Sequence, residues 1–129
     1  MIEVGMKGHE EVMVTPENTA AAMVSGTLPV FATPCMISLM EATAWKSISA
    51  EVEEGWSTVG TSLDVKHLSA TPIGMKVWCD SELIEVDRKR MVFKLEVFDE
   101  AGKIGEGIHE RFLVQNDKFL ARAEAKKAQ

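Results

Sequence analysis

The chain has 129 residues, and 14 Lys and Arg residues against 20 Asp and Glu residues give it a net charge of −6 at pH 7. This length fits a single domain over residues 1–129, and the negative charge disfavours nucleic acid or an anionic membrane surface as the main partner. The N-terminus lacks the features of a signal peptide, and no apolar stretch approaches the roughly 20 residues that span a bilayer. We therefore expect a cytoplasmic protein. Its two cysteines, Cys35 and Cys79, have neither metal-ligand spacing nor the density of a disulfide framework, which predicts reduced thiols.

The first half of the chain predicts one strand and two helices. Residues 6–14 favour a strand, and Pro16 begins a short Ala-rich helix that Gly26 ends. Thr33 and Pro34 suit the cap and the first position of a longer helix, which extends to about Ala50. This second helix is so apolar that we expect it to be buried on nearly all sides.

The second half of the chain changes to a period of two residues. Strands are predicted over 57–67, 75–86, 91–99 and 103–115, and the gaps at 87–90 and 100–102 predict two hairpins. Residues 117–129 predict a short surface helix. The order of one strand, a buried helix and four antiparallel strands indicates an α+β fold in which a curved sheet wraps the long helix. Because so small a sheet has open edges, we expect a homodimer, or a dimer of dimers.

Glu41 is a carboxylate inside the apolar helical segment 35–45. Burying an unpaired charge costs several kcal/mol or more, so this position predicts either a cation partner on the sheet or a chemical role. At about 100° per residue, Glu41 lies some 80° around the helix from Thr33 and about two turns along it, so both side chains can border one cleft. Thr33 itself is either a helix cap or a reactive hydroxyl beside backbone N–H groups that stabilise an oxyanion. Pro34 lacks an N–H group, which leaves Cys35 and Met36 as oxyanion donors.

Two histidines compete for a place beside this carboxylate. His67 shares a strand face with apolar residues by the two-residue period, which is typical of a core histidine unless a carboxylate lies next to it. Together, Thr33, Glu41 and His67 have the groups for acid–base or nucleophilic chemistry. His109 is the second candidate, in a polar stretch where Glu110 and Arg111 are interpreted as an exposed ion pair.

Two small residues add further hypotheses about this site. Cys35 is an alternative nucleophile, because a helix N-terminus lowers the pKa of a thiol, but it ranks below Thr33. Gly60 lies within a predicted strand, where a glycine indicates a bulge or a close approach of substrate to the backbone.

Three segments, residues 30–42, 59–67 and 105–112, together resemble the hotdog-fold acyl-CoA thioesterases and, within them, the fluoroacetyl-CoA thioesterase-like family. The resemblance extends over nearly the whole chain. It implies a hotdog fold, with the family's catalytic groups on Thr33, Glu41 and His67 and its substrate contacts at Gly60 and Arg111. The three catalytic residues are those already grouped from their residue types and spacing.

The resemblance implies hydrolysis of a small or short acyl-CoA to CoA and a carboxylic acid, with no metal or bound cofactor. The fluoroacetyl-specific enzyme is similar in having an aromatic lid over its acyl pocket, but residues 19–29 contain no aromatic residue. The sequence therefore does not predict fluoroacetyl selectivity. Two alternatives stay open, a non-catalytic acyl-CoA-binding hotdog module and an enoyl-thioester hydratase, because one fold hosts several chemistries. Candidate cations for the CoA phosphates are Arg88, Lys89 and Arg90, or Lys66 and Lys76.

Overall fold

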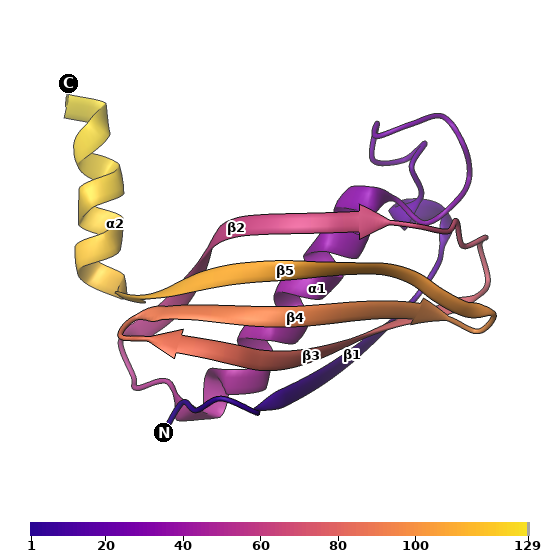
Figure 1. The fold of residues 1–129 in the computed structure, drawn as a ribbon. Coiled ribbons are helices and arrows are strands. Elements are labelled where there is room, and N and C mark those ends of the chain that lie inside the picture. The colour runs from indigo at the N-terminus through magenta and orange to yellow at the C-terminus, as the bar shows by residue number, and fades with distance from the viewer. Residues whose placement is uncertain (129) are drawn as a thin grey trace.

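The computed structural model describes residues 1–128 and shows a five-stranded antiparallel sheet curved around one long helix (Figure 1). The elements in chain order are β1 (Lys7–Met13), η1 (Pro16–Asn18), α1 (Thr33–Ile48), η2 (Ser49–Glu51), β2 (Trp56–His67), β3 (Lys76–Asp87), β4 (Arg90–Asp99), β5 (Gly102–Gln115), α2 (Asn116–Glu124) and η3 (Ala125–Ala128). The predicted α+β arrangement is confirmed, and each predicted strand is present to within one residue or so at either end.

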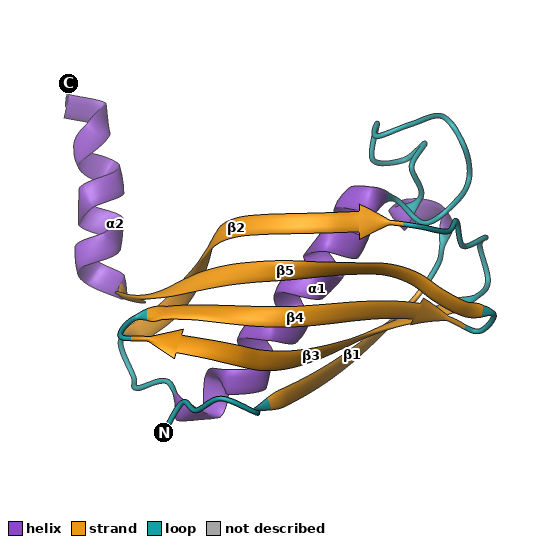
Figure 2. Cartoon of the chain, viewed as in Figure 1, coloured by secondary structure: helices purple, strands orange, loops and turns teal. Residues whose placement is uncertain are grey.

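The strands have the spatial order β1-β3-β4-β5-β2, so β1 and β2 form the two edges of the sheet (Figure 2). The predicted hairpins join β3 to β4 and β4 to β5. The pairing of β2 with β5 shifts register between Gly60 and Ser62, which confirms the predicted bulge at Gly60. On its other side, β2 pairs with no strand of the described residues.

Helix α1 packs one face against the concave side of the sheet. Its buried residues are Met36, Leu39, Met40, Thr43, Ala44 and Ile48. In a single copy of the protein, the prediction that this helix is buried on nearly all sides is wrong, because Pro34, Ser38 and Trp45 are exposed on it. A single sheet covers only one face of a helix, so the apolar character of the opposite face needs a different explanation.

The Ala-rich helix predicted between Pro16 and Gly26 is also wrong. Only Pro16–Asn18 forms a helical turn, of the 3-10 type, and the chain then folds back on itself. The N–H of Ala20 donates to the carbonyl of Val30, and that of Ala21 donates to the carbonyl of Leu28. These cross-loop bonds replace the bonds to residues four positions back that a helix requires, so the loop overrides the local helix propensity.

The C-terminal segment forms α2 and η3, neither of which contains a buried residue. This confirms the predicted surface helix, apart from Gln129, which lies outside the described residues. None of the helices within residues 1–128 is long and apolar enough to cross a membrane.

Candidate active site

Thr33 and His67 meet where α1 begins and β2 ends. The Thr33 hydroxyl Oγ1 lies 2.7 Å from His67 Nδ1, within hydrogen-bond distance. Thr33 is the first residue of the helix and Ala32 occupies the cap position, so the predicted capping role of Thr33 is wrong. Burial lowers the pKa of His67, which favours the neutral imidazole at pH 7. Its Nε2 atom is buried and has no hydrogen-bond partner among the described residues.

The start of α1 offers fewer free N–H groups than expected. The N–H of Met36 donates to the carbonyl of Ala32 at 2.9 Å, so the prediction that Met36 supplies an oxyanion donor is wrong. Cys35 forms no hydrogen bond of this kind among the described residues. Burial raises the pKa of the Cys35 thiol, which disfavours the thiolate and weakens Cys35 as an alternative nucleophile.

Glu41 lies on the next turns of α1, with 39% of its side chain exposed, so its predicted burial is not found. Its Oε2 atom accepts a hydrogen bond from Nη1 of Arg111 on β5 at 3.3 Å. A cation on the neighbouring sheet was one of the two predictions for this carboxylate. The pair keeps Glu41 oriented while leaving part of the carboxylate accessible to water or a ligand.

Arg111 is fixed by four hydrogen bonds, and only 7% of its side chain is exposed. Its Nε and Nη2 groups donate to Thr58, to the hydroxyl at 2.9 Å and to the carbonyl at 2.8 Å. Its Nη1 group contacts both Glu41 and His109. A guanidinium has five N–H groups, so one on Nη2 is left for a ligand. Burial lowers the pKa of Arg111, whereas the nearby Glu41 favours its charged form. No motif or spacing around Thr58 predicted that it anchors Arg111.

His109 is fully buried beneath this ion pair. Its Nδ1 lies 2.9 Å from the carbonyl of Ser62, to which it can only donate, so Nε2 accepts from Nη1 of Arg111 at 3.1 Å. Burial lowers the pKa of His109, and the positive charge of Arg111 adds to the effect. The histidine nearest Glu41 is therefore His109, with Nε2 at 4.0 Å from the carboxylate.

The predicted ion pair between Glu110 and Arg111 is wrong. Glu110 pairs with Arg90 instead, on the opposite side of the strand from Arg111. The two-residue period contains the signal for the correct arrangement, since it places His109 and Arg111 together on the other face of β5.

Gly60 on β2 lies directly beside the Glu41 carboxylate. A Cβ atom added at this position would be 2.6 Å from Glu41 Oε2 and 3.1 Å from His109 Cε1. The missing side chain is thus what allows the carboxylate to approach the strand. Gly60 and Arg111, the two predicted substrate contacts, are brought together with Glu41.

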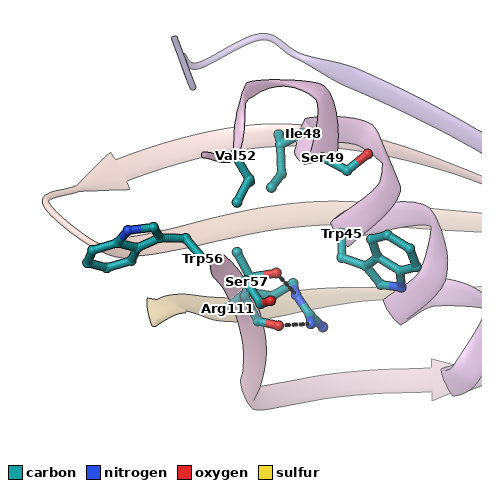
Figure 3. Close-up of a pocket in the computed structure, with 8 residues that line it drawn as sticks. Trp45, Ile48, Ser49, Val52, Trp56, Ser57 and Arg111 are labelled. Atoms are coloured by element: carbon teal, nitrogen blue, oxygen red, sulfur yellow. Dashed lines mark hydrogen bonds between the residues drawn. The ribbon is translucent and has the colours of Figure 1, made fainter. Parts of the chain in front are cut away.

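The site residues therefore form two groups, Thr33 with His67 and Glu41 with Arg111 and Gly60. No hydrogen bond or ion pair within residues 1–128 joins one group to the other. Beside the second group lies a cavity of about 350 Å³, lined by Trp45, Ile48, Ser49, Val52, Trp56, Ser57, Thr58 and Arg111 (Figure 3). No group of three or more His, Cys, Asp or Glu side chains in the described part of the chain is arranged to hold a metal ion.

Comparison with known proteins gives a consistent result. Residues 14–117 match the family described as FlK, fluoroacetyl-CoA-specific thioesterase. The fluoroacetyl-CoA thioesterase of Streptantibioticus cattleyicolor is 35% identical over 97 residues, which are 75% of this chain and 70% of that protein. A solved structure of FlK superposes with a TM-score of 0.93 at 30% identity, covering 98% of both chains. A thioesterase superfamily member from Thermus thermophilus has a TM-score of 0.91 at 29% identity, covering 99% of this chain and 95% of that one. These matches confirm the predicted hotdog fold, and the chain belongs to the fluoroacetyl-CoA-specific thioesterase family.

Proposed function

We propose that this protein hydrolyses small or short acyl-CoA thioesters in the cytoplasm, with Thr33, Glu41 and His67 as its catalytic residues. Gly60 and Arg111 border the substrate in this proposal, and no metal or bound cofactor is needed. Family membership supports the reaction class. The observation that carries the site is the hydrogen bond of 2.7 Å between Thr33 and His67 at the start of α1, with the carboxylate of Glu41 oriented further along the same helix.

The neutral imidazole of His67 accepts the proton of the Thr33 hydroxyl on Nδ1, which requires its own hydrogen to lie on Nε2. Thr33 then attacks the thioester carbonyl, the C–S bond breaks, the CoA sulfur takes up the proton from His67, and water cleaves the resulting ester. Alternatively, Thr33 keeps its proton and orients the attacking water, whose proton Glu41 takes up. In a third route, a Glu41 oxygen attacks the carbonyl, the C–S bond breaks, the CoA sulfur takes up a proton, and water cleaves the resulting anhydride. One turnover in heavy-oxygen water separates the routes, because only cleavage of the anhydride can leave label in the Glu41 carboxylate.

The reaction is tested by measuring free thiol release from acetyl-, small branched-, aromatic- and medium-chain acyl-CoAs. We expect turnover of at least one small substrate. An enoyl-CoA that loses its enoyl absorbance without releasing thiol would favour the hydratase alternative. Acyl-CoA binding with no turnover of any substrate would favour the non-catalytic module.

The proposed role of His67 predicts a loss of activity in acid. Because burial lowers the pKa of His67 below its ordinary value of 6.5, the imidazole stays neutral down to that lowered pKa and is protonated only below it. We therefore expect kcat/KM to be constant near neutral pH and to fall as the pH drops through this lowered pKa. The free energy of unfolding should decrease as the pH drops from 6.5 to the lowered pKa, because the unfolded state binds more protons than the folded state in this window.

Titration of the histidines by NMR checks which group causes the fall of kcat/KM at low pH. His9 is the internal comparison, because its contacts with Glu11 and Asp80 raise its pKa. Activity that follows the titration of His9 rather than that of His67 would contradict the assignment.

We further propose that the protein is a homodimer joined through the edge of β2. This strand has 12 residues, pairs on one side only among residues 1–128, and ends at His67. Beside it, α1 exposes 42% of Trp45, and β2 itself exposes 38% of Leu63. Antiparallel pairing of two β2 strands would place the His67 end of one copy beside the Trp56 end of the other, which would bring together site residues from both copies.

Substituting Leu63→Lys is expected to convert this dimer to monomers. Leu63 lies opposite His109 and so points to the concave side, where an inward-pointing charge on an edge strand opposes pairing. Sedimentation velocity measures the change, and Ile84→Lys is the control, because Ile84 is 41% exposed and lies on β3. A Leu63→Lys protein that keeps the wild-type mass in solution would place the interface elsewhere.

A further inference from the structure

Three adjoining grooves lead from Arg111 around the start of β2. The first is the cavity of about 350 Å³ beside Arg111, in which Trp45 and Trp56 lie at opposite ends (Figure 3). A second groove, of about 220 Å³, shares Val52 and Trp56 with it. A third groove, of about 190 Å³, shares Trp56 and Lys89 with the second. Trp56 therefore lines all three, so the grooves adjoin one another around this side chain.

The outer groove is cationic and aromatic. It is lined by Trp56, Lys89, Phe112, Leu113, Val114, Gln115, Lys118, Phe119 and Arg122, so it contains three cations and no acidic residue. Lys89 Nζ lies 5.4 Å from the centre of the Trp56 ring. None of the three cations has a carboxylate within 4.0 Å among residues 1–128. A positive groove free of carboxylates stands out in a chain of net charge −6.

Most of the other lysines and arginines that the sequence offers for phosphate binding lie close to carboxylates. Arg88 has no ion pair among residues 1–128, but it lines none of the three grooves. Arg90 pairs with Glu85 and Glu110, and Lys76 pairs with Glu11. A groove of about 400 Å³ on the sheet contains three lysines, but three acidic residues line it as well: Lys66, Lys94, Lys103, Asp64, Glu96 and Glu106. Charge therefore singles out the groove around Lys89 as the place for a polyanion.

We propose that the outer groove binds the nucleotide end of the CoA substrate, an inference that rests on the proposed thioesterase function. That end carries a diphosphate and a terminal phosphate monoester, which alone has a charge of about −1.5 to −2 at pH 7. Lys89, Lys118 and Arg122 supply the charge that such groups require. The half-buried ring of Trp56 and the exposed rings of Phe112 and Phe119 offer stacking surfaces for adenine.

The path between the groove and the site explains how one molecule reaches both. The pantetheine arm runs along the first and second grooves, whose lining includes the apolar residues Ile48 and Val52. Two carboxylates border the second groove, and one of them, Glu51, is already paired with the N-terminal amino group. The thioester end then arrives next to Arg111, which lines the first groove.

The test compares acetyl-CoA with acetyl-pantetheine, which has the same reacting end but no nucleotide. In the triple variant Lys89→Gln, Lys118→Gln and Arg122→Gln, we expect KM for acetyl-CoA to rise about tenfold or more, as the loss of three exposed charge contacts implies. We expect kcat for acetyl-CoA and both constants for acetyl-pantetheine to stay the same. Added salt should raise the KM of the wild type for acetyl-CoA more than that of the variant.

The matched control removes three exposed lysines outside the groove, Lys7→Gln, Lys94→Gln and Lys126→Gln. An equal rise in KM for acetyl-CoA in the control variant would overturn the groove as a nucleotide site. So would an equal change in KM for acetyl-CoA and acetyl-pantetheine in the groove variant. Calorimetry with adenosine 3′,5′-bisphosphate separates this failure from failure of the proposed function. If no thioester is hydrolysed, wild-type binding that the triple variant loses still supports the groove, and absence of binding overturns it.

Discussion

Replacing Glu41 by Gln is expected to lower kcat for acyl-CoA hydrolysis by about a hundredfold to ten-thousandfold, the usual scale for losing an acid–base group. Glutamine has nearly the same size, and its side-chain carbonyl can still accept the hydrogen bond from Arg111. It can neither take up a proton from water nor attack a thioester as a carboxylate. The loss should therefore appear in kcat and leave substrate binding nearly unchanged.

Stability is the control measurement for this variant. Because 39% of the Glu41 side chain is exposed, losing its ion pair with Arg111 should change the free energy of unfolding by at most about 1 kcal/mol. Arg111 also keeps its bonds to Thr58 and His109. Glu82→Gln, on the exposed face of β3, removes an equal charge and should leave the rate at the wild-type value. A Glu41→Gln enzyme with wild-type kcat would mean that Glu41 only anchors Arg111.

The strands were predictable because one face of each is buried, and this imprints a two-residue period on the sequence. In β3, for example, Val77, Cys79, Ser81 and Leu83 alternate with more exposed neighbours. The loop after Pro16 was not predictable in the same way. Its alanines favour a helix locally, whereas the bonds that decide its shape come from Leu28 and Val30, several residues further along the chain.

The residue types of the candidate site were predictable, but their contacts were not. Thr33, Glu41 and His67 could be selected because hydroxyl, carboxylate and imidazole groups are reactive and were set among apolar residues. Which histidine lies beside Glu41 depends on how far along the sheet each histidine lies relative to α1, and the two-residue period does not determine this position. In the structure it is His109 on β5, with Nε2 4.0 Å from the carboxylate, whereas His67 lies at the end of β2 beside Thr33.

The helix α1 shows a further limit of sequence reasoning. Its apolar composition predicted burial on nearly all sides, yet Trp45 and Ser38 are exposed in a single copy. The apolar composition of a helix predicts that its surface is buried, but it does not identify which element or partner buries it. Trp45 lies in the cavity beside the start of β2, so the proposed dimer through the β2 edge offers a partner for it, whereas Ser38 borders a groove with residues of β1, at the other edge of the sheet.

Gly60→Ala is expected to reduce kcat by about a hundredfold, because an ångström-scale displacement of a catalytic group has an effect of that size. The backbone at Gly60 does not have the positive φ that favours glycine, so alanine meets only a steric conflict. The new Cβ would lie 2.6 Å from Glu41 Oε2, the end of a flexible and partly exposed side chain, and 3.1 Å from Cε1 of the buried His109, which has to move by only a few tenths of an ångström. Glu41 can swing away at little cost, so the melting temperature should stay within a few degrees of the wild type while activity is lost.

Gly107→Ala is the matched comparison on the neighbouring strand β5, and the opposite result is expected from it. Its Cβ would lie 2.9 Å from the backbone carbonyl of Asp64, which cannot move without disturbing the pairing of β2 with β5. We expect a loss of stability of about 1–3 kcal/mol, typical of overpacking, with activity retained by the fraction that is folded. Thermal unfolding and thiol release, measured on both variants, distinguish the two effects. If Gly60→Ala lost stability as Gly107→Ala does while its folded fraction kept the wild-type rate, the close approach of Glu41 to β2 would serve the fold rather than the reaction.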